Sequence, residues 1–155
     1  MGKRREGREA AVQFLFCSDI NQELGPDDID NFFSTIRPAS PRVREFAKIL
    51  ATGVCEQRAE VDATIEKHTQ NYKLDRISAV DRSILRLAVY ELIFRDDIPN
   101  VVSINEAIEV AKRFGTEESG RFVNGILDNL NRALRAESDR STRATPSAAD
   151  AEPSA

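Results

Sequence analysis

Apolar residues recur along most of the chain at the spacing that places them on one face of a helix. Val61 and Ile65, for example, are four residues apart, and His68 follows three residues later. Between Pro41 and Pro99 there is no other proline and only one glycine. A β-rich domain would need turn residues about every 8–12 positions. The pattern therefore predicts an all-α fold.

The same spacing, together with helix-start signals, sets the boundaries of the expected helices. Ser78 with Asp81 and Ser103 with Glu106 are spaced as capping pairs that begin two of them. We predict seven helices, over residues 4–20, 27–36, 41–57, 59–71, 79–95, 104–114 and 117–135.

One of these helices differs from the others in how its apolar residues are distributed. In 79–95, Ile84 and Leu92 lie on one side and Leu87 and Phe94 on the other. A helix that is apolar nearly all round must have other helices packed on several sides. We therefore expect 79–95 to be the central, buried helix of a compact seven-helix domain.

The length of 155 residues suits a single domain, which we place at residues 1–136. From Glu137 onward the chain contains Pro, Ser and Ala but no large apolar residue. Such a stretch buries too little surface to offset its ordering entropy. We therefore predict that residues 137–155 form a disordered tail.

Several classes of protein are excluded by what the chain lacks. No apolar run exceeds four residues, so we expect no membrane span, and no secretory signal follows the basic N-terminus. Cys17 and Cys55 do not have the spacing of metal or redox pairs, and His68 is the only histidine. No phosphate-binding loop or nucleophile motif occurs. We therefore predict a cytoplasmic protein with no catalytic residues, no metal site and no cofactor.

The net charge of −4 argues against a general nucleic-acid binder, but the charges are unevenly distributed. Residues 9–36 contain no Lys or Arg and six acids, namely Glu9, Asp19, Glu23, Asp27, Asp28 and Asp30. Residues 1–8 carry four cations against one acid, a net charge of +3. This asymmetry predicts two surfaces with different partners.

The basic cluster at the N-terminus, Lys3, Arg4, Arg5 and Arg8, lies where positive charge is unfavourable. Cations at the start of a helix oppose the macrodipole at a cost of about 0.3–1 kcal/mol each. An anionic partner would offset that cost, and Arg4, Arg5 and Arg8 are spaced so that one phosphate could meet them together. A frayed and solvated terminus is the alternative interpretation of the same residues.

A second candidate surface lies on the last predicted helix. Phe122 falls at the edge of the apolar arc, with Glu118 and Gly125 beside it on the polar side. An exposed ring next to a glycine could support an unstacked base, and a carboxylate could accept a hydrogen bond from an exocyclic amine. The residues alone favour the simpler alternative, in which Phe122 is peripheral core and Gly125 a close-packing point.

Two stretches of the chain contain motifs that carry a family resemblance. Residues 79–130 contain LRLAVYEL, INEAIE and FVNGIL in that order, and residues 4–16 are RREGREAAVQFLF. Both stretches resemble the NusB family of bacterial transcription antitermination factors, and the second is similar to the opening of the family. The resemblance covers about residues 3–135. It implies two small helical bundles sharing a core. It also implies binding to boxA RNA of nascent ribosomal RNA together with a small-subunit ribosomal protein, NusE, within the antitermination complex of RNA polymerase.

The resemblance also implies which residues bind each partner. The RNA-binding residues would be Lys3, Arg4, Arg5, Arg8, Glu118 and Phe122. The ribosomal protein would contact Phe16 and Asp81. Glu118 stands where the family often has Asp, Asp81 where it usually has Glu, and Phe16 where it often has Tyr, so this chain lacks one hydroxyl at that contact.

Three questions stay open at the level of sequence. A NusB-like domain also precedes the methyltransferase domain of some ribosomal RNA methyltransferases, so an accessory role in RNA modification is one alternative. A protein–protein adaptor without RNA contact is another. A homodimer that covers the RNA surface is the third.

Overall fold

The computed structural model describes the backbone of residues 2–69 and 73–151, and side chains up to residue 140. That part of the chain contains helices and turns and no strand. The helices are α1 (Lys3–Ile20), α2 (Ile29–Asn31), α3 (Pro41–Glu56), α4 (Arg58–Lys67), α5 (Ala79–Phe94), α6 (Asn100–Phe114) and α7 (Ser119–Ala151). The predicted all-α class is confirmed, and none of these helices has the length and apolar composition needed to cross a bilayer.

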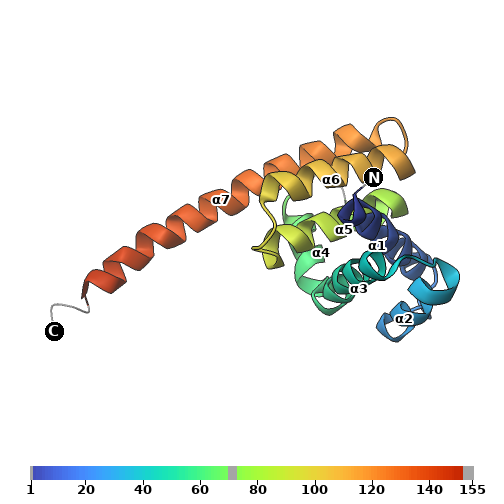
Figure 1. Cartoon of the computed structure of the whole chain (residues 1–155). Helices are drawn as coiled ribbons and strands as arrows, with labels where there is room; N and C mark the ends of the chain where they lie inside the picture. The colour runs from blue at the N-terminus through green and yellow to red at the C-terminus, as the bar shows by residue number, and fades with distance from the viewer. Residues whose placement is uncertain (1, 70–72, 152–155) are drawn as a thin grey trace.

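Helix α5 occupies the centre of the molecule, as its sequence predicts (Figure 1). It packs against α1, α3, α4, α6 and α7, and Ile84, Leu85 and Val89 are buried on its different sides. The elements before α5 form one small bundle, and α5 forms the other with α6 and α7. One continuous core, in which Phe14, Leu50, Leu85 and Leu127 are all fully buried, joins the two bundles.

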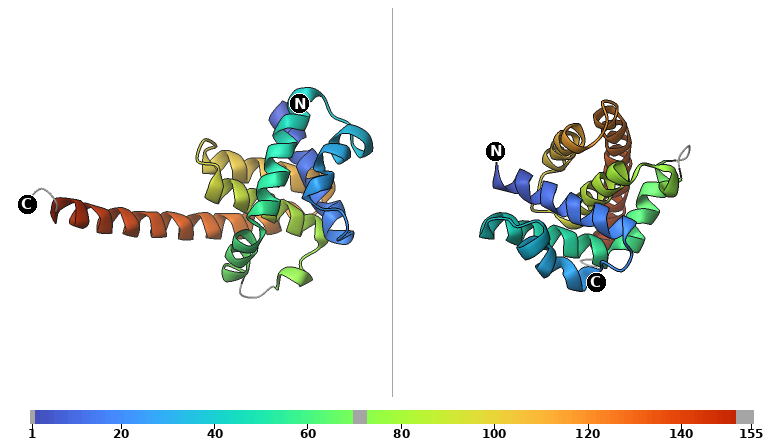
Figure 2. Two further views of the ribbon diagram at one scale, coloured as in Figure 1. Left: turned by 90° about the horizontal axis from the view of Figure 1, so that it is seen from below. Right: turned by 90° about the vertical axis from the view of Figure 1, so that its right-hand side faces the viewer.

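Helices α1 and α3 lie side by side and run in the same direction (Figure 2). Gly7 of α1 lies against Phe46 of α3. Asp19 and Arg58 each lie twelve residues further along the chain from these two, and Asp19 Oδ1 is 3.6 Å from Arg58 Nη2. A Cβ atom on Gly7 would lie 2.7 Å from the Phe46 ring, so this close approach requires glycine. As a result, the first turns of α1 and α3 meet at one edge of the molecule.

The predicted start of one helix is wrong. Helix α6 begins at Asn100, four residues before the predicted 104, so Ser103 does not cap it. The Ser103 hydroxyl instead donates to Glu91 Oε1 at 2.9 Å, and Glu106 binds Arg5. The other capping pair is confirmed, because the backbone N–H of Asp81 donates to Ser78 Oγ at 3.2 Å.

Three smaller differences concern element ends. The segment predicted as one helix over 27–36 consists of a 3-10 turn (Pro26–Asp28), α2 and a π turn (Phe32–Ile36). A further 3-10 turn at Leu74–Arg76 is not predicted. Helix α4 ends at Lys67, and positions 70 and 71 of the predicted 59–71 helix lie outside the described residues.

The last helix continues well past the predicted end at 135. Helix α7 runs to Ala151 and projects from the body (Figure 1). Residues 137–155 are expected to be a disordered tail, and positions 152–155 of that prediction lie outside the described residues. The expectation counts only apolar burial, whereas a helix also forms through its own local hydrogen bonds, and alanine and arginine favour it. Residues 135–140 are exposed, and Pro146 removes one backbone hydrogen bond. We therefore expect this extension to be the least stable part of α7.

Candidate nucleic-acid interface

The cations of the N-terminal cluster have different surroundings. Lys3 and Arg4 are exposed, and the Arg4 Cζ lies 4.9 Å from the centre of the Phe46 ring, within cation–π range. Arg5 is 37% exposed and its Nη2 donates to Glu106 Oε2 at 2.6 Å, which raises the pKa of Arg5. Three cations therefore reach the surface at the first turn of α1, and one of them also has an internal partner.

Arg8 is not part of this surface. Its side chain is 2% exposed, and its Nε and Nη2 donate to the two carboxylate oxygens of Glu91 at 2.9 and 2.8 Å. A phosphate could reach Arg8 only by breaking a buried ion pair. We therefore reassign Arg8 from the predicted RNA contact to a structural role. Glu91, an acid in a helix that is otherwise apolar nearly all round, is the sequence signal for such a pair.

A groove of about 460 Å³ opens beside the exposed cations. The lining residues are Lys3, Arg4, Arg42, Glu45, Phe46 and Ile49. Four of them belong to α3, and the sequence does not predict them as site residues. The reason is that the parallel packing of α1 against α3 cannot be predicted from the sequence of either helix.

A second ion pair lies close to this groove. Arg95 donates from Nε and Nη2 to Asp97 at 2.9 and 2.8 Å, and its Cζ lies 6.0 Å from the centre of the Phe46 ring. The hydrogen bond from Arg95 lowers the pKa of Asp97 to about 2. Asp97 is therefore ionised at neutral pH and neutralises Arg95.

The two predicted residues on the last helix lie in a different cavity, of about 230 Å³, near the start of α7. Glu118 is exposed there, and Phe122 packs partly against the core. A Cβ on Gly125 would meet nothing within 4 Å, so close packing does not explain that glycine.

Asp81, predicted to bind the protein partner, lines the same cavity as Glu118 and Phe122. Its Oδ1 is buried and has no hydrogen-bond partner among the described residues. The structure thus brings Glu118 and Phe122, which are predicted to bind RNA, and one predicted protein contact to a single cavity.

Phe16, the other predicted protein contact, lines a neighbouring apolar groove of about 380 Å³. Phe32, Ile36, Val80 and Phe114 contribute to its walls, and Ile36 is exposed. Because Val80 directly precedes Asp81, this groove and the cavity that contains Asp81 are adjacent.

Much of the predicted acidic surface is neutralised internally. Asp19 accepts hydrogen bonds from Arg82 and, at 3.2 Å, from Arg86. Burial raises the pKa of Asp19, but the two guanidinium groups outweigh it and the net pKa is lowered. Glu9 pairs with Arg113 at 3.5 Å and Asp30 with Lys48 at 2.5 Å. The exposed acidic region is therefore smaller than the sequence indicates.

Comparisons with known proteins identify relatives of this chain in sequence. A model of the NusB family matches residues 5–132. A protein of Myxococcus xanthus named transcription antitermination protein NusB is 44% identical over 137 residues, which cover 86% of this chain and 98% of the relative.

Solved structures show the same fold. Thermotoga maritima NusB superposes with a TM-score of 0.74 at 38% identity, covering 85% of this chain and 92% of that one. A crystal structure of antitermination factors NusB and NusE in complex with dsRNA superposes with a TM-score of 0.73 at 28% identity, covering 86% and 98%.

Proposed function

The chain belongs to the NusB family, and from this membership we propose that it is a transcription antitermination factor. It binds boxA RNA of nascent ribosomal RNA transcripts together with the ribosomal protein NusE, promotes read-through by RNA polymerase and supports ribosome biogenesis. The family match over residues 5–132 carries the proposal, because it includes Arg5 of the basic N-terminus and all of the surface around Phe122.

The RNA surface in this proposal consists of Lys3, Arg4 and Arg5 at one end and Glu118 and Phe122 at the other. The cations bind phosphates, and Glu118 and Phe122 bind an unstacked base. No role in RNA contact is assigned to the buried Arg8.

The direction of α6 relative to α1 supports the binding of a single RNA strand to both ends of this RNA surface. Arg5 binds Glu106 and Glu9 binds Arg113, so the two helices run in the same direction. The turn from α6 to α7 therefore lies beyond the Phe16 end of α1. From Arg4 to Phe16 the helix rises about 18 Å, a distance that several nucleotides of extended RNA can span.

We place the ribosomal protein on the apolar groove at Phe16 and on Asp81. The groove offers apolar area, and the Asp81 carboxylate offers a partner for a basic protein. Because Asp81 lies in the same cavity as Phe122, bound NusE would contact the end of the RNA surface. This adjacency supports tighter RNA binding when both partners are present.

The protein acts in this proposal as an adaptor in the cytoplasm, without catalysis of its own. Residues 1–136 contain all of the residues that bind RNA and NusE in this proposal. Removal of 137–155 is therefore expected to leave the affinity for boxA RNA unchanged.

The test is a binding titration of labelled boxA RNA with the full chain, with and without purified NusE. We expect measurable binding that NusE tightens. If NusE binds the chain but RNA does not bind in either mixture, the protein is an adaptor without RNA contact and the proposal is wrong.

A further inference from the structure

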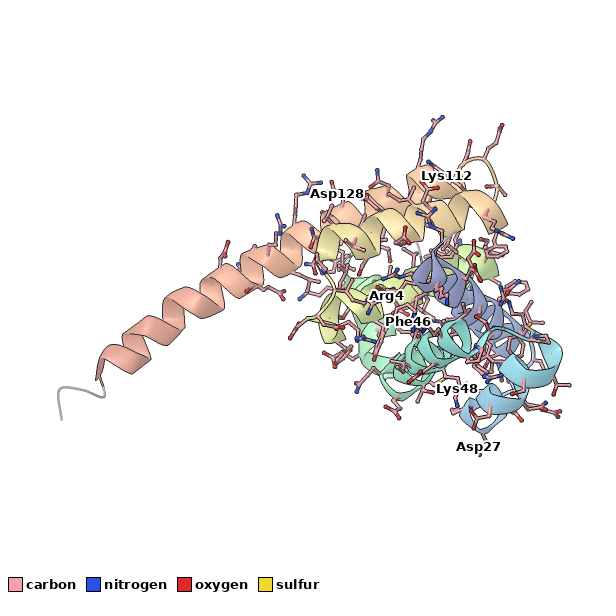
Figure 3. All side chains as sticks on the ribbon, viewed as in Figure 1. Arg4, Asp27, Phe46, Lys48, Lys112 and Asp128 are labelled. Carbon is pink, nitrogen blue, oxygen red and sulfur yellow. The ribbon has the colours of Figure 1, made fainter. Side chains whose placement is uncertain are left out.

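The groove between the first turns of α1 and α3 has basic walls that internal contacts leave unneutralised. Lys3, Arg4 and Arg42 are exposed, and none of them forms an ion pair with any residue that the structure describes. Lys48, on the same helix as Arg42, is by contrast paired with Asp30 (Figure 3 labels Lys48 and Arg4). Against these three cations the groove contains one acid, which leaves an excess charge of +2.

The groove also has an apolar face. Ile49 is 46% exposed, an unusual position for a large apolar side chain beside three cations. Phe46 is held against Gly7 and supports the guanidinium of Arg4 (Figure 3). Arg4 is itself exposed, so its guanidinium contacts the ring and remains accessible to a ligand.

This combination fits single-stranded nucleic acid better than a small anion. A free phosphate would need only the cations, whereas a nucleotide also brings a flat base that stacks on guanidinium planes and apolar side chains. Glu45 at the rim would repel a phosphate, but its carboxylate can accept a hydrogen bond from the exocyclic amine of a base.

Resting on the function proposed above, we propose that this groove binds one unpaired nucleotide of the RNA and its flanking phosphates. Arg42 and Lys3 bind the phosphates, and the base lies against Ile49 and Arg4. The RNA surface thus extends from α1 onto α3, to residues for which the sequence gives no indication.

The experiment measures binding of labelled single-stranded boxA RNA to the full chain in the presence of NusE, at several salt concentrations. The variants are Arg42→Ala and Ile49→Asn, and the matched control is Lys48→Ala, which removes the same charge from α3 outside the groove. Circular dichroism and melting temperature establish that each variant is folded. We expect the variants to fold, because the substituted side chains are exposed or partly exposed.

We expect Arg42→Ala to weaken binding about tenfold and to reduce the salt slope by about 0.7. Ile49→Asn should weaken binding several-fold with an unchanged slope, and Lys48→Ala should match the wild type. Equal affinities for wild type, Arg42→Ala and Ile49→Asn would overturn this inference alone. An absence of RNA binding by the wild type would overturn the proposed function as well.

Light scattering on the same samples measures the oligomeric state and tests the alternative that the groove is a contact between two copies of the chain. If Arg42→Ala keeps its RNA affinity but changes the oligomeric state, the groove is a contact between two copies of the chain and the inference is wrong.

Discussion

The guanidinium of Arg8 and the carboxylate of Glu91 form a two-hydrogen-bond pair inside the molecule, with exposed fractions of 2% and 1%. The pair joins α1 to the central helix α5, and Ser103 of α6 donates a further hydrogen bond to the same carboxylate. A residue of the basic N-terminal cluster is therefore part of the core, and it must be distinguished from its exposed neighbours in any mutational study of RNA binding.

Replacement of Arg8 by alanine should destabilise the fold by about 3–5 kcal/mol, because Glu91 would remain as an unpaired buried charge. Urea unfolding followed by circular dichroism measures this decrease in stability. Arg4→Ala is the matched control, since Arg4 is exposed, and it should change stability by less than about 1 kcal/mol. Equal stability of the two variants would contradict the structural role of Arg8.

Replacement of Glu106 by glutamine should strengthen RNA binding by up to about fivefold, because a partly exposed pair is worth about 0.2–1 kcal/mol and its removal frees Arg5 for phosphate. The measurement is RNA affinity as a function of salt. Glu109→Gln is the control, because Glu109 acts on Arg5 only through its charge and forms its own ion pair with Lys112. A weaker affinity of Glu106→Gln would show that Glu106 positions Arg5 for RNA rather than competing with it.

Asp19 should make the stability of the fold depend on pH. Its pKa is lowered in the folded state, so its contribution is complete above pH about 4, the pKa of an unfolded aspartate, and is lost as the pH falls through the lower folded pKa. Asp19→Asn should lose about 2 kcal/mol at pH 7. It should also show a smaller decrease in stability below pH about 4. The measurement is the free energy of unfolding of the wild type and of Asp19→Asn at a series of pH values. Parallel curves of stability against pH would show that Asp19 does not contribute to the pH dependence.

Phe122 distinguishes base stacking from simple packing. Phe122→Ala should weaken RNA binding by about 1–3 kcal/mol if a base stacks on the ring. Because Phe122 also packs on the core, Phe122→Leu is the informative partner variant: it keeps apolar volume but removes the aromatic face. RNA affinity and melting temperature are measured for both. A leucine variant with wild-type RNA affinity would make Phe122 a core residue only.

The fold could be predicted to a large extent because helical patterning is local. The apolar spacing of α3 and α5, and the Ser78 cap, specify those helices within a few residues. The predicted start of α6 is wrong because Ser103 and Glu106 have the spacing of a cap but bind Glu91 and Arg5, which are distant in sequence.

The candidate site could be predicted only in part, for the same physical reason. The basic cluster is visible in the sequence, but burial of Arg8 depends on Glu91, which lies 83 residues away. The participation of Arg42 and Ile49 depends on how α1 and α3 pack together. Local patterns contain neither relationship.

The most direct test of RNA binding through the N-terminal surface is the salt dependence of boxA RNA affinity, with NusE present, for the wild type and a Lys3→Ala, Arg4→Ala, Arg5→Ala triple variant. If these three cations bind phosphates, the triple variant should bind more weakly. Its slope of log affinity against log salt should be smaller by about 0.7 for each phosphate that is no longer bound, or about 2 in all. A folded triple variant with the affinity and slope of the wild type would contradict the account.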